Sequence, residues 1–144
     1  MSTGGEGPPD GFVESTSRGP FTTHNGPVYH KPGDPQVRGF RAQLRHCNGF
    51  GIVHGGWLMA FTDGVLGGAV WEATKSRSVT LRMNSDFIGM VRQGEWVEGR
   101  GVVTRSTRSL AFARAELTVA GKVVLTAEGV FKLMTGGNRR SGRA

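Results

Sequence analysis

A long apolar run from His54 to Trp71 constrains this chain more than any other feature, because Asp63 is its only ionisable residue after the first histidine. The run is longer than a typical strand, and its Leu, Met and Ala residues favour a helix. Since it is apolar on nearly every side, we expect a helix that is buried on nearly every side. A charge at the centre of a bilayer costs about 2.5–3.5 kcal/mol, so we interpret the run as a core helix and expect no membrane span.

The residues around this helix have the alternation of strands. Residues 37–45 place Phe40, Ala42 and Leu44 on one face, and after the helix Val79 and Leu81 alternate with polar residues. Strands are also expected after short polar turns at 96–104, 110–119 and 123–133. One strand, one long helix and four strands predict an α+β fold, in which an antiparallel sheet wraps around the helix.

Composition divides the 144 residues into three parts. Residues 1–25 are rich in Gly, Pro, Ser and Thr and are expected to form a flexible segment, residues 26–134 the folded domain, and residues 135–144 a basic disordered tail. The first residues lack the basic and apolar regions of a secretory signal, and Cys47 is the only cysteine. Both features predict a reducing, cytoplasmic location.

Charge is distributed unevenly along the chain. The net charge is +7, and residues 1–37 hold four acids and two bases, so the remainder carries +9. A basic domain favours an anionic partner, either nucleic acid or a phosphorylated small molecule. A basic surface that only aids solubility is an equally reasonable interpretation.

The polar features of the apolar run are costly and therefore informative. A buried carboxylate costs several kcal/mol unless it is paired, so Asp63 is either a structural group or a candidate general base or nucleophile. Gly55 and Gly56, at the expected start of the helix, would leave backbone N–H groups open to a ligand. Glycine at 64, 67 and 68 suits close packing of a neighbouring backbone or of the sheet.

Helix geometry separates His54 from Asp63. Nine positions correspond to about 900° of rotation and about 13.5 Å of rise, so the two side chains point to opposite sides. If both belong to one site, the second half must come from another copy of the chain, as in a two-fold dimer with antiparallel helices.

At these residues the chain resembles the PaaI-like (phenylacetate-degradation type) hotdog-fold acyl-CoA thioesterases. Asn48-Gly49-Phe50-Gly51-Ile52-Val53-His54-Gly55-Gly56 matches the family signature N-x-x-G-x-x-H-G-G, and Asp63 follows at the family's spacing. Further similar stretches are SVTLRMNSDF, GEWVEGRGVV, RSTRSLAFARAEL and GKVVLTAEGVFKL, so the likeness covers residues 36–133. In the turn after the strand that contains Thr80, where the family often has a proline, this chain has Gly89-Met90. The bulk of Trp57, just inside the helix, is expected to narrow the acyl pocket.

The resemblance implies a hotdog fold and the hydrolysis of acyl-CoA. The Gly55 N–H would polarise the thioester carbonyl, Asn48 and His54 would line the same half-site, and Asp63 of the neighbouring chain would act as base or nucleophile, assisted by Thr80. The expected contacts to CoA are Gly56, Arg92, Arg105 and Arg108. No metal and no cofactor beyond the CoA of the substrate is implied, and the active sites of a homodimer or a homotetramer would lie between subunits.

Other functions fit the sequence less well. A non-catalytic acyl-CoA-binding hotdog protein would keep the groove but would not need Asp63, and a hotdog hydratase would need an Asp–His pair placed differently. Nucleic-acid binding is disfavoured, because the strands of this sequence do not interleave aromatic and basic residues and the sequence contains no known nucleic-acid-binding motif. A Cys47–His46 catalytic pair is disfavoured because adjacent strand residues point to opposite faces, and the histidines near Cys47 lack zinc-site spacing.

Overall fold

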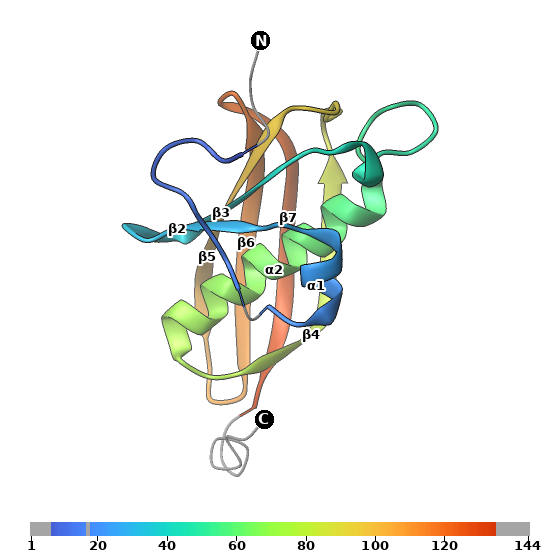
Figure 1. Cartoon of the computed structure of the whole chain (residues 1–144). Coiled ribbons are helices and arrows are strands. Elements are labelled where there is room, and N and C mark those ends of the chain that lie inside the picture. The colour runs from blue at the N-terminus through green and yellow to red at the C-terminus, as the bar shows by residue number, and fades with distance from the viewer. Residues whose placement is uncertain (1–6, 17, 135–144) are drawn as a thin grey trace.

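A single antiparallel sheet wraps around one long helix, α2 (Gly55–Thr74), in the computed structural model, which describes residues 7–16 and 18–134 (Figure 1). Within these described residues, the sheet has seven strands in the order β1-β2-β3-β5-β6-β7-β4. The strands are β1 (Val13–Glu14), β2 (Tyr29–Lys31), β3 (Asp34–Arg41), β4 (Ser78–Phe87), β5 (Trp96–Ser106), β6 (Leu110–Val119) and β7 (Lys122–Leu133). The short helices are α1 (Pro20–Asn25) and the 3-10 helix η2 (Leu44–His46). The predicted α+β hotdog arrangement is confirmed.

Helix α2 begins where the sequence predicts and ends later than the apolar run. His54 is the N-cap, and its Nδ1 accepts a hydrogen bond from the Gly56 N–H at 2.7 Å. The helix continues beyond the apolar run to Thr74, and Lys75 ends it in the left-handed region at φ 56°. None of the helices in the described ranges is both long and apolar enough to cross a membrane.

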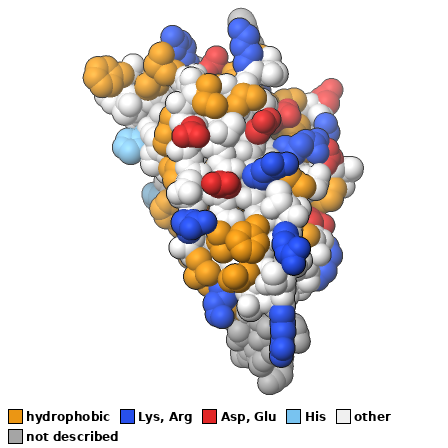
Figure 2. Space-filling model, turned by 180° about the vertical axis from the view of Figure 1, so that it is seen from behind, with side chains coloured by type: hydrophobic (Ala, Val, Ile, Leu, Met, Phe, Trp, Pro, Cys, Tyr) orange, Lys and Arg blue, Asp and Glu red, His pale blue; other side chains and the backbone are white. Residues whose placement is uncertain are grey.

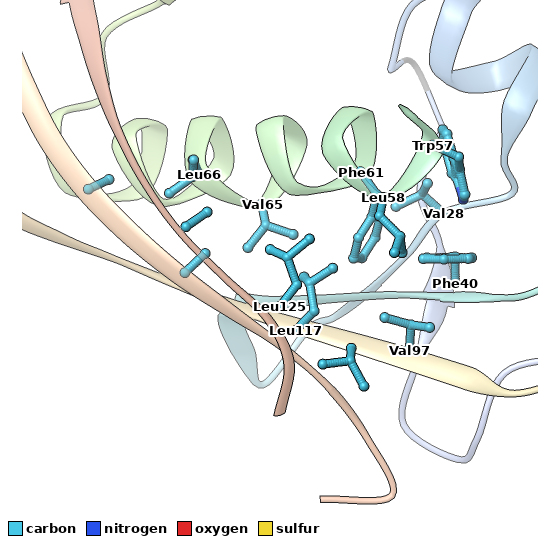
Figure 3. Close-up of a cluster of buried hydrophobic side chains, with 14 of the residues drawn as sticks. Val28, Phe40, Trp57, Leu58, Phe61, Val65, Leu66, Val97, Leu117 and Leu125 are labelled. Atoms are coloured by element: carbon cyan, nitrogen blue, oxygen red, sulfur yellow. The ribbon is translucent and has the colours of Figure 1, made fainter. Parts of the chain in front are cut away.

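The inner face of the sheet has small residues where α2 packs against it. A Cβ atom at Gly99 would lie 2.7 Å from the Val65 side chain and 2.8 Å from Leu117, and one at Gly101 would lie 2.8 Å from the Val65 carbonyl oxygen. These missing side chains let the helix approach the sheet closely. Leu66, Leu117, Leu125 and Val97 are fully buried in the resulting core (Figure 3).

The chain leaves the first long strand earlier than its alternation predicts. Phe40 and Ala42 are buried as expected, but β3 ends at Arg41, and Leu44 lies in η2 with 70% of its surface exposed. The physical reason is a local capping interaction, in which the Gln43 N–H donates to Nδ1 of His46. That hydrogen bond turns the chain away from the strand and toward the loop before α2.

The segment expected to be flexible has secondary structure at β1 and α1. Phe12 is buried beside Tyr29 and Val37, and its ring meets that of Trp96 edge-on at 5.0 Å. This second apolar cluster fixes part of the segment to the domain through Phe12, an apolar residue of the segment that could be expected to dock. Residues 1–6, residue 17 and the basic tail 135–144 lie outside the described residues.

Candidate active site

The loop before α2 is held by the side chain of Asn48. Its Oδ1 accepts hydrogen bonds from the N–H groups of Phe50 at 2.8 Å and Ile52 at 3.4 Å. The His54 N–H donates to the carbonyl oxygen of His46 at 2.8 Å. Asn48 therefore fixes the approach of the chain to the helix start, beside His54.

The first turn of α2 leaves one backbone donor open. The N–H of Gly56 is used by the His54 ring, and those of Trp57 and Leu58 donate to the His54 carbonyl oxygen. The N–H of Gly55 has no acceptor within the described part of the chain. Because it lies at the positive end of the helix dipole, it can stabilise a negatively charged oxygen. The expected contact of Gly56 with substrate is not available through its N–H, since the cap uses that group.

Asp63 and Thr80 come together, although they are far apart in the sequence. The Thr80 hydroxyl donates to Oδ1 of Asp63 at 2.5 Å, a short distance typical of a bond to a charged acceptor. Asp63 is half-buried, and no cationic side chain of the described residues lies within ion-pair distance of it. The carboxylate is therefore oriented by a hydroxyl, and its second oxygen is available for chemistry.

One chain holds these two groups apart. Helix α2 is continuous from Gly55 to Thr74, so the open N–H and the Asp63 carboxylate are separated by about 12 Å along its axis. Thr80 lies near the start of β4, while Phe87, at the end of that strand, lies beside Gly55: a Cβ there would be 3.3 Å from its ring. The two halves of the expected site thus lie at opposite ends of one edge strand.

The edge strand β4 exposes apolar side chains. Val79 and Leu81 are 48% and 55% exposed, and Phe87, Ile88 and Met90 continue the exposed apolar surface past the strand's end. Among the described residues, β4 is the last strand of the sheet and pairs only with β7. A long apolar edge is normally covered in native proteins, because its open backbone groups would otherwise recruit another strand.

The three arginines expected to contact CoA lie in different places. Arg92 is next to the loop before α2, where its backbone forms an isolated antiparallel β-bridge with Ile52. Arg105 lies near the end of β5, a strand of 11 residues and about 33 Å, and Arg108 lies in the connection to β6. Arg105 lines a shallow depression on the outer face of the sheet, where charged and apolar side chains are interspersed (Figure 2). A single chain does not gather the three arginines around one ligand.

Two further arginines contact α2, and the sequence analysis did not identify them. The guanidinium of Arg38 lies against Gly68, where a Cβ would be 2.7 Å from Nη2, and that of Arg18 lies against Gly64. At these two glycines α2 therefore contacts arginine side chains of the same chain, and not the closely packed backbone that we expected. Arg18 was not predicted because it lies in the segment expected to be flexible. The signal in the sequence was the pair of glycines four residues apart, which leaves room on one face of the helix for such side chains.

His46 is a structural residue. Its ring stacks on that of Trp57 at 5.1 Å, its Nε2 donates to the Asn25 carbonyl oxygen at 2.6 Å, and its Nδ1 accepts the Gln43 N–H. The Cys47 thiol donates to the Gln43 carbonyl oxygen and does not bond to the histidine. Among the described residues, no three metal-ligating side chains come together.

Acidification should weaken the fold through His46. Burial, with repulsion from Arg45 in addition, lowers the pKa of this histidine below its ordinary 6.5, against an opposing effect of the hydrogen bond to Asn25. The unfolded chain then binds more protons than the folded one as the pH falls below about 6.5, so stability decreases from there downward. Melting temperatures at pH 7.5 and 5.5 should differ more in the wild type than in His46→Leu. His24→Gln, at an exposed position, should keep the wild-type difference, and an unchanged difference in His46→Leu would contradict this assignment.

Comparisons with known proteins agree with this architecture. The family model described as "Thioesterase superfamily" matches residues 50–126. A Pseudomonas aeruginosa relative named "Putative esterase PA0474" is 32% identical over 129 residues, which covers 87% of this chain and 96% of the relative.

Solved structures show the same fold. A mutant of the phenylacetic acid degradation protein PaaI from Thermus thermophilus superposes with a TM-score of 0.68 and 28% identity, covering 79% of this chain and 98% of that one. A Streptococcus mutans protein bound to acetyl CoA has a TM-score of 0.65 at 20% identity and covers 69% of this chain and 80% of that one. The matched family model and the curated relative together show that the chain belongs to the thioesterase superfamily.

Proposed function

We propose that this protein hydrolyses acyl-CoA thioesters to the free acid and CoA. The observation that carries the proposal is the half-buried Asp63 carboxylate, which Thr80 orients and no cation neutralises within the described residues. Membership of the thioesterase superfamily supports a thioester as substrate. The net charge of +7 suits the phosphates of CoA, and the same fold accommodates acetyl CoA in the Streptococcus mutans protein. A cytoplasmic location, where CoA esters occur, belongs to the same proposal.

The geometry suggests a division of roles. The open N–H of Gly55 would donate to the thioester carbonyl oxygen and stabilise the oxyanion that forms during attack. Asp63 would take a proton from the attacking water, or attack the carbonyl carbon itself and be released later by water. In both cases the oxygen of water ends in the acid, the C–S bond breaks, and the CoA sulfur leaves and receives a proton. Thr80 would hold the carboxylate in the required orientation, and Asn48 and His54 would hold the helix start.

The site would be completed by a second copy of the chain. Within one chain the Gly55 N–H and Asp63 are about 12 Å apart along α2, too far to act on one carbonyl. An antiparallel, two-fold pairing of β4 edges would bring Thr80 of one copy near Phe87 of the other, and so Asp63 near Gly55. It would also cover the apolar edge strand. A homodimer and a dimer of dimers both satisfy this requirement.

A panel of acyl-CoAs tests the activity. Aryl, medium-chain and long-chain thioesters are incubated with the protein, and released thiol is measured. We expect turnover of at least one class. Binding of the panel without any turnover would favour a non-catalytic acyl-CoA-binding protein.

Mixing two inactive variants should restore activity if the site is shared. Gly55→Pro removes the open N–H; proline suits the first helical position, and His54 has a backbone conformation (φ −62°, ψ 134°) that can precede it. Each mixed dimer of Gly55→Pro and Asp63→Asn contains one site with both native groups. Random mixing in a two-fold dimer should therefore recover about a quarter of wild-type turnover per site.

The control for this experiment is a mixture of Gly55→Pro with the double variant Gly55→Pro/Asp63→Asn. No site of that mixture has both native groups, so it should stay inactive. If the first mixture also stays inactive after subunit exchange, which mass spectrometry of the assemblies can verify, the shared site is wrong.

A further inference from the structure

A small cavity lies where the segment around α1, strand β3 and the side of α2 meet. Its volume is about 20 Å³, and its lining includes Arg18, Thr22, Arg38, Trp57, Ala60 and Gly64. A single water molecule needs about 10–15 Å³, so the cavity has room for one particle of about that size. An acyl group or a phosphate does not fit.

Two guanidinium groups reach this cavity from different elements. Arg18, before α1, lies against Gly64, where a Cβ would be 3.4 Å from its Nη2. Arg38, in β3, lies against Gly68, where the corresponding distance is 2.7 Å, and its Nη1 donates to the Pro35 carbonyl oxygen at 2.8 Å. Because the two glycines are about one turn apart on the same face of α2, about 6 Å along its axis, the two charges are held close to each other.

This pair of like charges has no counter-ion among the described residues. Neither guanidinium lies within ion-pair distance of a carboxylate, and the carboxylate of Glu72 is bonded to Lys75 at 3.1 Å. Burial lowers the pKa of both arginines, and repulsion from Arg18 lowers that of Arg38 further, against the opposing effect of Glu72. Two partly buried like charges destabilise the folded state, whereas an anion between them would attract both.

The residues that line the cavity also have unused hydrogen-bond donors. The Nε of Arg38 and the Nε1 of Trp57 are buried and have no acceptor within the described part of the chain. Such donors are rare in native proteins. Arginine and tryptophan side chains can only donate, whereas the Thr22 hydroxyl can donate and accept. Since a water molecule has hydrogens of its own to donate, a negatively charged acceptor without hydrogens suits this lining better.

We infer that Arg18 and Arg38 together bind one monatomic anion of the halide class, such as chloride. The two charges and the unused donors require an anion, and the volume restricts it to a small one. The bound ion would fix the segment before α1 to β3 and to the side of α2. The inference does not depend on the proposed hydrolysis, because the two guanidinium groups lie against residues 64 and 68, at least nine positions along α2 from the open N–H of Gly55.

The NMR line width of chloride measures this binding directly. The full chain should broaden the chloride signal, and bromide should reverse the broadening, whereas the larger gluconate ion should not. Arg18→Gln and Arg38→Gln should each remove most of the effect. Arg114→Gln makes the same change of net charge at an exposed position on the outer face of the sheet and should keep it.

Two results of this measurement would contradict the inference. Equal broadening by the wild type and by both cavity variants would mean that chloride does not bind at these arginines. Displacement of chloride by phosphate as readily as by bromide would overturn the restriction to a monatomic ion.

Thermal unfolding in two salts tests the same site through stability. Arg18→Gln removes one of the two like charges, and the wild-type side chain makes no hydrogen bond to another described residue, so the variant should fold. In sodium gluconate it should be at least as stable as the wild type, because the repulsion is relieved. Replacement of gluconate by chloride at equal ionic strength should raise the melting temperature of the wild type by about 2–4 °C and that of the variant by less. The same increase in both proteins would overturn the inference.

Discussion

Asp63→Asn should reduce kcat for thioester hydrolysis by about 100-fold to 10,000-fold, the range that a positioned general base contributes. The amide has the size of the carboxylate and its oxygen can still accept the hydrogen bond from Thr80, so the local structure should persist. What is lost is the ability to take a proton from water or to attack the carbonyl. Steady-state kinetics on the best substrate of the panel, with thermal unfolding of the same samples, measures both effects.

Two companion variants show whether the loss is specific. Asp10→Asn makes the same chemical change at an exposed position and should leave kcat unchanged. Thr80→Val removes the hydroxyl that orients Asp63 and should reduce kcat less than the loss of the carboxylate itself. Unchanged turnover in Asp63→Asn would remove the proposed role of this residue, although the assignment to the superfamily would stand.

Phe40→Ala should lower the free energy of unfolding by about 3–5 kcal/mol, the usual effect of deleting a fully buried aromatic ring. Phe40 is 0% exposed, and its ring meets those of His46, Trp57 and Phe61 edge-on at centroid distances of 5.5, 5.5 and 4.7 Å (Figure 3 labels all but His46). Alanine leaves a cavity beneath the first turns of α2. For a domain of this size the melting temperature should fall by about 10 °C or more, as calorimetry or circular dichroism would show.

The matched control for this variant is Phe50→Ala, because Phe50 is 89% exposed in the loop before α2. Its effect on the free energy of unfolding should stay within about 0.5 kcal/mol. A Phe40→Ala protein as stable as the Phe50→Ala protein would mean that the core beneath the helix start can collapse around the missing ring.

The lengths and periods of the apolar segments were sufficient to predict the main elements. Helix α2 follows from the run between His54 and Trp71, and β4 to β7 follow from alternation and short turns, because each of these signals is local in the chain. The separation of Gly55 from Asp63 is equally a property of the sequence, since a continuous helix fixes rise and rotation per residue. Alternation failed at Leu44, where the side chain of His46 redirects the backbone.

The tertiary structure decided which distant residues meet. Asp63 and Thr80 are 17 positions apart, and Arg18 reaches Gly64 from a segment whose composition predicted flexibility. It also separated Arg92, which lies before β5 and beside the loop preceding α2, from Arg105, which lies near the end of β5. The physical reason is that local periodicity determines which face of an element is apolar, whereas the pairing of elements depends on how the whole chain closes around its core. The sequence therefore determined the helix and the groups that it carries, and the fold determined that a hydroxyl orients its carboxylate and that two arginines flank its glycines.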